Sequence, residues 1–433
     1  MPEESGIERW SSHAGFILAA IGAAVGIGNI WRFPTLLGQN GGGAFLIPYF
    51  VAVFVFALPL MVLEISAGRQ FRGTVLSAFG AVRPRFRILG WLICIISFII
   101  TSYYLVITGW TLAFLSFSVT GSNISFAMFT STLEPLVFTA VAALVTALVV
   151  AAGVRKGIER MATLLIPACI VILIIMVLSS ITLPGFAEGM QFLFTPDFSV
   201  LTRPDIWLAA FGQALFSLSV GEGIMLTYGA YMAQEQDIRK SAIIIAIADT
   251  SVALLAGIVI FPVVFSCGLS PAAGAELAFT TLPVAFATMP FGRFFATAFF
   301  ALLFFAAITT TVALLEVYVA AVRETMVWTR RRATLLLSMT LFAAAMLPAL
   351  SYSALNLTID GLPFLDFLDR TAGTVGLHIT AIIVAVVFTT CAGPGGFFFE
   401  NGGPTRVNRC IFFLCKYLIP AVLIVTVVAD LFF

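Results

Sequence analysis

Charged side chains, histidine and cysteine are all scarce in this sequence. Of its 433 residues, 10% are charged, two are histidine and six are cysteine, whereas 61% are hydrophobic. So little charge, with a mean hydropathy of +1.10, excludes a soluble domain. The cysteines have neither metal-ligand spacing nor a disulfide framework, and the short basic loops carry no nucleic-acid signal. His13 and His378 have no zinc-type spacing and no convincing catalytic partner, so we do not expect an enzyme.

Long apolar runs fill the chain instead. About 20 apolar residues suffice to cross a bilayer as a helix, so we expect an all-α polytopic membrane protein with about 11 transmembrane helices. The expected spans are residues 14–37, 44–70, 88–118, 136–153, 161–183, 206–232, 241–267, 294–322, 333–350, 371–397 and 411–433. The first ten residues are polar, and Arg32 lies within the first span, so no cleavable signal peptide is expected.

Basic residues are distributed unevenly between the expected loops. Most of the 22 Lys and Arg residues lie in the N-terminal tail or in the alternate loops that share its side. The opposite loops contain Arg203, Arg293 and Arg370. The positive-inside rule therefore predicts a cytoplasmic N-terminus in the cell (inner) membrane, and an odd number of spans then predicts a C-terminus outside.

Two of the expected spans are interrupted by glycine and polar residues, at 22–34 and at 216–223. The first interruption contains Asn29 and Arg32, and the second contains Glu222 between two glycines. A backbone group without a partner in hydrocarbon costs several kcal/mol, so irregular chain at that depth indicates a cavity or a ligand. Two interrupted spans in corresponding halves of a sequence point to the binding site of a transporter.

The two interruptions also suggest how the chain is organised. Spans one to five (about 14–183) and six to ten (about 206–397) can be overlaid as repeats, each of which opens with its broken helix. Five is an odd number, so the second repeat must be inverted in the membrane. We therefore expect a single transmembrane transporter domain over 1–433, built as a 5+5 inverted repeat with an extra helix at about 411–433.

The first interruption carries a specific motif. Gly26-Ile-Gly-Asn-Ile-Trp-Arg-Phe-Pro34, followed by Gln39-Asn-Gly-Gly-Gly-Ala-Phe45, resembles the first-helix signature of the neurotransmitter:sodium symporter family, and most of all that of its bacterial amino-acid transporters. Other matching segments are Ser102-Tyr-Tyr104, Lys156-Gly-Ile-Glu-Arg160, Gly212-Gln213 and Thr309-Thr310. The resemblance covers essentially the whole chain. It implies a sodium-coupled symporter that imports an amino acid by alternating access.

The resemblance implies an amino-acid site at the two breaks. Its residues are Ala23, Ala24, Gly26, Ile27, Gly28, Ile100, Tyr104, Phe216, Ser217, Ser219, Glu222, Thr310 and Leu314. Monoamine-transporting relatives carry an aspartate at the position of Gly26, so the glycine implies a substrate with its own carboxylate, which Tyr104 would bind. From the residues alone, unwound carbonyls can bind cations and the N-terminus of the following half-helix attracts an anion. Packing through small residues is the competing interpretation.

Two sodium sites follow from the same resemblance. The implied ligands of the first are the carbonyl of Ala24 with Asn29, Ser217 and Asp249, joined by the substrate carboxylate. Those of the second are the carbonyls of Gly22, Val25 and Ala306 with the hydroxyls of Thr309 and Thr310. All are oxygen ligands, which hard cations prefer.

Asp249 departs from the asparagine that many members have there. Ala253 stands where they have either serine or glutamate, in chloride-dependent and chloride-independent members respectively. The two residues are four apart and so lie on one helix face. We expect Asp249, near Tyr49 and Gln213, to serve as both sodium ligand and fixed substitute for chloride, so that no chloride is required.

Glu222 occupies a position where leucine-transporting members have phenylalanine. Three interpretations remain open. Glu222 could pair with a polar or cationic substrate side chain. It could instead be protonated by burial and cap the unwound backbone, which would suit a neutral substrate. It could also take part in proton coupling.

The resemblance implies two gates, with Arg32 and Asp369 outside and Trp10, Arg9 and Glu324 inside. The family usually places the inner arginine three residues before the tryptophan, where this chain has Ile7. Arg9 lies immediately before Trp10, so the inner gate would need altered geometry. Other classes remain open as well. A channel would need a pore-lining ring or filter, whereas a non-transporting receptor on the same fold would not need both sodium sites.

Overall fold

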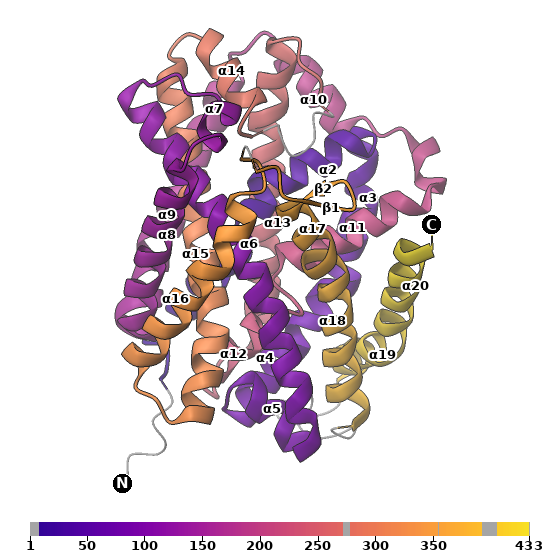
Figure 1. Cartoon of the computed structure of the whole chain (residues 1–433). Helices are drawn as coiled ribbons and strands as arrows, with labels where there is room; N and C mark the ends of the chain where they lie inside the picture. The colour runs from indigo at the N-terminus through magenta and orange to yellow at the C-terminus, as the bar shows by residue number, and fades with distance from the viewer. Residues whose placement is uncertain (1–7, 272–277, 354, 392–404, 433) are drawn as a thin grey trace.

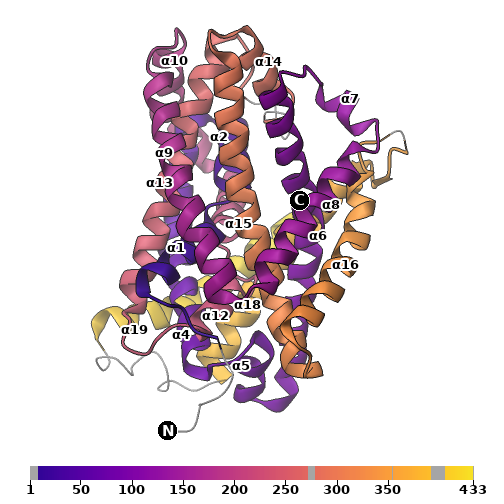
Figure 2. The same ribbon diagram turned by 90° about the vertical axis from the view of Figure 1, so that its left-hand side faces the viewer.

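The computed structural model describes residues 8–271, 278–353, 355–391 and 405–432, and its helices form one elongated bundle (Figure 1). Three short helices, α7, α10 and α14, lie at the end of the bundle away from the N-terminus, as both ribbon views show (Figure 2). We call these two ends the N-terminal end and the opposite end. Ile7, residues 392–397 of the tenth expected span and Phe433 lie outside the described residues.

The first half of the chain is helical from His13 to Thr202. Its elements are α1 (His13–Ala24), η1 (Gly28–Arg32), α2 (Phe33–Gln39), η2 (Gly42–Phe45), α3 (Leu46–Val51), η3 (Ala52–Ala57), α4 (Leu58–Phe71), α5 (Val75–Val82), η4 (Pro84–Phe86), α6 (Arg87–Thr120), α7 (Phe126–Thr130), α8 (Glu134–Ala151), η5 (Val154–Glu159), α9 (Arg160–Ser180), α10 (Phe186–Phe194) and η6 (Phe198–Thr202).

The second half is also mainly helical and contains a two-stranded antiparallel hairpin. Its elements are α11 (Pro204–Ser217), α12 (Ile224–Ala230), α13 (Ile238–Ser266), α14 (Thr281–Thr288), α15 (Gly292–Met326), α16 (Arg330–Ala349), β1 (Thr358–Ile359), β2 (Leu362–Pro363), α17 (Phe364–Leu368), η8 (Asp369–Gly376), α18 (Leu377–Val386), η9 (Val387–Cys391), α19 (Arg406–Phe413), η10 (Leu414–Leu418) and α20 (Ile419–Phe432).

The expected spans are present. Among the described residues, nine helices are long and apolar enough to cross a membrane, and a tenth span is the bent pair formed by α1 with η1 and α2. The sixth expected span, residues 206–232, is divided between α11 and α12, which are separated by residues 218–223. Both interruptions therefore fall where the sequence predicts them. The inverted relation between the two halves remains a prediction.

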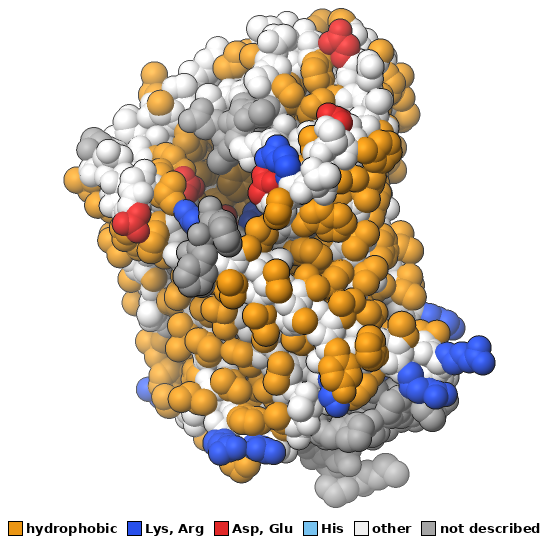
Figure 3. Space-filling model, turned by 90° about the vertical axis from the view of Figure 1, so that its right-hand side faces the viewer, with side chains coloured by type: hydrophobic (Ala, Val, Ile, Leu, Met, Phe, Trp, Pro, Cys, Tyr) orange, Lys and Arg blue, Asp and Glu red, His pale blue; other side chains and the backbone are white. Residues whose placement is uncertain are grey.

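The outer surface of the bundle is apolar. α9, for example, exposes Ile170, Val171, Ile174 and Leu178, which recur at helical spacing on one face. Figure 3 shows a broad hydrophobic band, Lys and Arg side chains near the N-terminal end, and a hollow at the opposite end beside acidic and basic side chains. An apolar surface of this extent is what a lipid-facing protein needs.

The site lies inside this bundle. The long helices α6 and α15 pack along each other, and α1 contacts α15, α9 and α13. The two parts of the second broken helix have other neighbours: α12 packs against α4, and α11 packs against α3 and η3. These contacts place both interruptions among buried residues rather than at the lipid surface.

Candidate functional site at the two helix breaks

The first break lies between α1 and η1. Val25 has extended backbone (φ −73°, ψ 93°), and the chain bends by 47° before the helix resumes. The freed amides have partners. The N–H of Gly26 donates to Oδ1 of Asn29 (3.0 Å), and the N–H of Ile27 donates to the hydroxyl oxygen of Tyr104 (3.0 Å). Tyr104 thus holds an amide of the break from a different helix, α6.

The second break lies between α11 and α12. Ser219 and Gly221 both have left-handed backbone, with φ of 52° and 89°. The N–H of Gly221 donates to Oε1 of Glu64 (2.7 Å), and the carbonyl of Glu222 accepts from the hydroxyl of Ser97 (2.6 Å). Side chains from α4 and α6 therefore supply the hydrogen bonds that a continuous helix would have made itself.

The two breaks contact each other. The hydroxyls of Ser219 and Thr310 both donate to the carbonyl oxygen of Ala23, at 3.0 and 3.1 Å. A Cβ on Gly26 would lie 2.4 Å from the Tyr104 hydroxyl and 2.7 Å from that of Thr310, so no side chain fits at Gly26. The approach of α1 to α6 and α15 therefore requires glycine at this position.

A small cavity lies between the breaks. It is lined by Ala23, Ala24, Gly26, Gly28, Ile100, Tyr104, Phe216, Ser217, Glu222, Thr310 and Leu314, all of which the sequence places in the substrate site. Its volume is about 10 Å³, which is room for about one water molecule. A larger ligand enters only if these side chains move apart.

Asn29, Ser217 and Asp249 converge beside this cavity. The Asn29 amide nitrogen is surrounded by three oxygens: the Ser217 hydroxyl at 3.0 Å, the Asp249 carbonyl at 3.0 Å and the Asp249 carboxylate at 2.6 Å. The Ser217 hydroxyl also lies 3.0 and 2.9 Å from the two carboxylate oxygens. All three side chains are essentially fully buried, and no ion pair among the described residues involves Asp249.

Thr309 and Thr310 lie where α15 packs on α1. Thr310 reaches the carbonyl of Gly22 at 3.4 Å, in addition to that of Ala23. The Thr309 hydroxyl donates within its own helix to the Ala306 carbonyl (2.9 Å), and a Cβ on Gly22 would lie 3.3 Å from the Thr309 Cβ. The structure thus brings the two threonines, Ala306 and Gly22 together.

Above the cavity, a vestibule of about 250 Å³ is bordered by residues from η1, α2, α6, α17 and the start of η8, with Arg32 and Asp369 among them. The Arg32 guanidinium lies 4.0 Å from the Asp369 carboxylate and 4.8 Å from the centre of the Phe216 ring. It also donates to Gln213 (3.4 Å), and Tyr103 donates to Asp369 (2.9 Å). The predicted outer pair is therefore assembled at the roof of the cavity.

The N-terminal end is closed by a different set of residues. Trp10 is buried, and its indole N–H donates to the carbonyl of Tyr228 (3.0 Å). Glu8 pairs with Arg330 at 2.7 Å and with Arg323 at 3.3 Å, and it accepts from the N–H of Val154 at 2.6 Å. The N-terminal segment is thus tied to α15, to the start of α16 and to η5.

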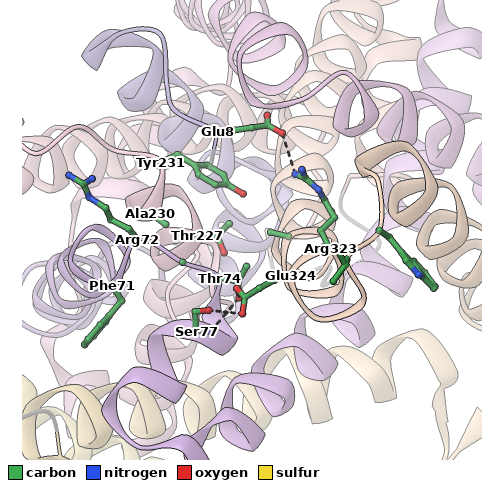
Figure 4. Close-up of a pocket in the computed structure, with 14 residues that line it drawn as sticks. Glu8, Phe71, Arg72, Thr74, Ser77, Thr227, Ala230, Tyr231, Arg323 and Glu324 are labelled. Atoms are coloured by element: carbon green, nitrogen blue, oxygen red, sulfur yellow. Dashed lines mark hydrogen bonds and ion pairs between the residues drawn. The ribbon is translucent and has the colours of Figure 1, made fainter. Parts of the chain in front are cut away.

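The network continues into the bundle. Arg330 also pairs with Glu316, a fully buried residue of α15, and Glu316 accepts from the Tyr231 hydroxyl (2.7 Å). Beside it lies a cavity of about 470 Å³, in which Glu8 and Arg323 point toward each other (Figure 4). This cavity is lined by both acidic and basic side chains.

Arg9 and Glu324, the residues predicted for the inner gate, lie apart from this network. The Arg9 side chain is exposed. Glu324 accepts from the hydroxyls of Thr74 (2.6 Å) and Ser77 (2.5 Å) and pairs with Arg87 at 3.2 Å. No ion pair joins Arg9 to Glu324 in the part of the chain that the structure describes. Trp10, by contrast, is buried at the closure of the N-terminal end.

Comparison with known proteins decides the family. The family model described as "Sodium:neurotransmitter symporter family" matches residues 7–133 and 134–432. The chain belongs to this family. The symporter is 31% identical over 457 aligned residues to an uncharacterized sodium-dependent transporter of Haemophilus influenzae, and 34% identical over 442 to one of Bacillus subtilis; each match covers 98% of both chains.

A solved structure agrees over the whole length of the symporter. The crystal structure of MhsT in complex with L-phenylalanine matches with a TM-score of 0.90 and 35% identity, and the match covers 98% of this chain and 100% of that one. The predicted all-α transporter fold is therefore confirmed. The chain is a multi-pass membrane protein of a sodium-dependent transporter family that handles small molecules, and it is not an enzyme.

The residues around Asp249 suit the cation that this family uses. Three oxygens already surround the Asn29 amide nitrogen at 2.6–3.0 Å, one of them from a carboxylate that has no positively charged partner among the described residues. Oxygen ligands with one negative charge are the donor set that a hard monovalent cation prefers. These oxygens, which here accept from the Asn29 amide, are thus of the kind that would bind Na+.

Sequence reasoning missed the buried acids that organise the site. Glu64 and Glu316 lie inside apolar spans, and that position alone is a functional signal because a carboxylate is costly in a membrane. Glu159 belongs to a motif that the sequence did flag, and its carboxylate accepts from the N–H of Ser11 (2.9 Å) just before α1. Nothing in the sequence singled out Glu8.

Proposed function

We propose that this symporter imports an amino acid together with Na+ by alternating access, without a requirement for chloride. The observation that carries the proposal is the convergence of Asn29, Ser217 and Asp249 next to a closed cavity at two helix breaks. A buried carboxylate that lacks a cationic partner is expensive in a membrane, and a bound cation relieves that cost. Binding of Na+ at this point would therefore be coupled to closure of the site.

Asp249 also supports independence from chloride. It supplies a fixed negative charge beside Ser217. A fixed carboxylate would do the electrostatic work of a bound anion, so no diffusible anion would be needed. The carbonyl of Ala24 and the substrate carboxylate would complete this first sodium site.

A second sodium site is proposed between α1 and α15. Its ligands would be the carbonyls of Gly22, Val25 and Ala306 and the hydroxyls of Thr309 and Thr310. The contacts that support it are those of Thr310 with Gly22 and of Thr309 with Ala306. A cation there would hold the first broken helix against α15.

The first break would bind the substrate carboxylate. The N–H of Ile27 and the hydroxyl of Tyr104 meet there, and no side chain can fill the place beside Gly26. Amides at the start of a half-helix favour an anion. A substrate that carries its own carboxylate would fit, which is our reason for proposing an amino acid.

Glu222 would govern the side chain that is accepted, which we propose to be polar or cationic. A neutral amino acid, with Glu222 protonated and structural, is the alternative on the same fold, and a non-transporting receptor is a further one. The excess of Lys and Arg at the N-terminal end supports a cytoplasmic N-terminus, with the C-terminus outside. Two inverted repeats, each opening with its broken helix, would supply the alternation.

Uptake into proteoliposomes tests the proposal. With an inward sodium gradient, a mixture of radiolabelled amino acids should accumulate, and replacing Na+ by choline should abolish accumulation whereas replacing chloride by gluconate should not. Asp249→Asn should raise the sodium concentration for half-maximal uptake about tenfold. Ser251→Ala, an exposed position two residues along α13, is the matched control and should behave as wild type. A strict chloride requirement would refute the role of Asp249.

A further inference from the structure

We infer that the substrate is an amino acid with a positively charged side chain, and that Glu222 is the group that pairs with this charge. The inference rests on the proposed function, because it assumes that the cavity between the breaks binds an amino acid. It narrows that function from amino acids in general to the lysine, ornithine and arginine class. Four observations around the second break carry it.

First, the unwound backbone does not need Glu222 as a cap. The N–H of Gly221 is bonded to Glu64, and the carbonyl of Glu222 itself is bonded to Ser97. The N–H of Val220 donates to the carbonyl of Leu215 at 3.0 Å. These three backbone groups are thus satisfied by residues other than the Glu222 side chain.

Second, the Glu222 carboxylate is buried without a complete set of partners. Its residue is 2% exposed, and its Oε2 has no hydrogen-bond partner among the described residues. An unsatisfied buried polar atom costs free energy, and far more when it carries charge. Such an atom persists where a ligand completes it.

Third, Glu222 borders the cavity in which the substrate would lie. The same cavity is bordered by Gly26 and Tyr104 of the proposed carboxylate site and by the apolar side chains of Ile100 and Leu314. Apolar walls suit the methylene stem of a basic side chain, while its charged end seeks an acid. The cavity therefore offers a place for each part of a basic amino acid.

Fourth, the charge around Glu222 is negative. Glu64 lies close enough for its charge to act on Glu222, and the tyrosines Tyr103 and Tyr104 are its other titratable neighbours. None of the ion pairs between described residues includes Glu64 or Glu222. A cationic side chain would offset the repulsion between two buried acids, whereas an aliphatic one would leave both uncompensated.

The test compares two ligands of nearly equal shape, L-lysine and L-norleucine, which differ by the terminal ammonium group. Binding is measured with the full-length protein purified in detergent, with and without Na+, and uptake is measured in proteoliposomes. Wild type should bind lysine at least tenfold more tightly than norleucine, because charge-assisted hydrogen bonds are the stronger kind. Glu222→Gln should weaken lysine binding by about tenfold or more, and Glu222→Met should bind norleucine more tightly than lysine.

Ser97→Ala is the control variant. It removes the hydroxyl that holds the Glu222 carbonyl but keeps the carboxylate, so lysine should remain preferred over norleucine whatever happens to overall affinity. If a Glu222 variant fails to fold, the comparison of lysine binding with norleucine binding by wild type still tests the inference. Size-exclusion chromatography identifies such a variant.

The failures can be told apart. Sodium-driven uptake of norleucine or leucine, with lysine ignored, refutes the basic-substrate inference and leaves the proposed function standing. A different failure is uptake of a neutral amino acid that depends on a pH gradient in wild type but not in Glu222→Gln, while lysine is neither bound nor taken up. That result refutes the inference and assigns Glu222 to proton coupling. If no amino acid binds or is taken up in the presence of Na+, the proposed function and the inference both fail.

Discussion

The two ends of the substrate pathway are closed in different ways. At the roof of the cavity, Arg32 and Asp369 form one long ion pair at 4.0 Å on the wall of a vestibule of about 250 Å³. Their other side-chain hydrogen bonds between described residues are to the neutral residues Gln213, Thr374 and Tyr103. At the N-terminal end, Glu8 is bonded at three points, to Arg330, to Arg323 and to a backbone amide. The closure at the N-terminal end is therefore the stronger of the two, and the vestibule lies on the weaker side.

The inner closure also has the reverse polarity of the expected one. The resemblance implies a basic residue in the N-terminal segment and an acid at the end of α15. In the structure the N-terminal segment contributes an acid, Glu8, and the bases Arg323 and Arg330 come from α15 and from the start of α16. Opening toward this end would require three contacts of one carboxylate to be broken together.

The largest expected effect comes from removing the charge of Glu8. Glu8→Gln should destabilise the closed N-terminal end by about 1.5–3 kcal/mol, because hydrogen bonds to charged groups contribute about that much. A cysteine placed at Ala230, which lines the cavity in Figure 4, should then react with a maleimide roughly 10- to 150-fold faster. Measuring the same rate without Ala230→Cys corrects for the native cysteines.

Arg9→Gln is the matched control, because Arg9 is the neighbouring residue and its side chain is exposed. Substitutions at such surface positions usually change stability by less than about 0.5 kcal/mol. Equal labelling rates for Glu8→Gln and Arg9→Gln would contradict the assignment of the inner closure to Glu8.

A second effect concerns pH. Burial alone would raise the pKa of Glu8, but Arg330, the N–H of Val154 and Arg323 together lower it below its ordinary value of 4.5. A group whose pKa is lowered in the closed state stabilises that state above its ordinary pKa, and loses this contribution as the pH falls through the lowered value. Because the thiolate is the reactive form, the labelling rate at Ala230→Cys is divided by the rate of a free thiol at the same pH; this ratio should be constant down to about pH 5 and rise only under more acidic conditions. Glu8→Gln should remove this rise, and a rise centred near neutral pH would assign the closure to another group.

A smaller effect is expected at the roof of the cavity. Asp369→Asn removes the attraction to Arg32 but keeps an acceptor for the Tyr103 hydroxyl. The pair is partly exposed and long, and such pairs contribute about 0.2–1 kcal/mol. Dissociation of a bound amino acid should accelerate about two- to fivefold, measured by dilution of preloaded protein. If Asp369→Asn accelerated dissociation by as large a factor as Glu8→Gln accelerates labelling, the two closures would contribute equal free energies.

Sequence motifs predicted the centre of the molecule better than its N-terminal end. Asn29 and Ser217 lie at glycine-rich breaks, and an acid such as Asp249 inside an apolar span is visible in any reading of the sequence. Their convergence in the structure follows from the pairing of two broken helices. The centre could be predicted because its chemistry depends on features that lipid would otherwise exclude.

The inner closure could not be predicted in the same way. Glu8 and Arg9 are adjacent polar residues in a tail, and the direction of the backbone before Trp10 decides which of them faces α15. That direction is set by tertiary contacts, among them the bond from the N–H of Trp10 to the carbonyl of Tyr231 (3.2 Å). Arg330 likewise belongs to a basic cluster that the positive-inside rule already explained, so nothing marked it as a partner.

The smallest expected effect concerns Glu324, the acid that the resemblance places at the inner gate. Its pair with Arg87 is exposed, with side chains 30% and 48% accessible, and contributes at most about 1 kcal/mol. Glu324→Gln keeps acceptors for the hydroxyls of Thr74 and Ser77, so the rate of sodium-driven uptake should change less than about twofold, and Arg87→Gln should match it. The double variant Arg9→Gln with Glu324→Gln separates the two possible inner gates. If uptake falls steeply in the double variant while Glu8→Gln transports as wild type, the inner gate is the Arg9–Glu324 pair, and the contrast between the two ends disappears.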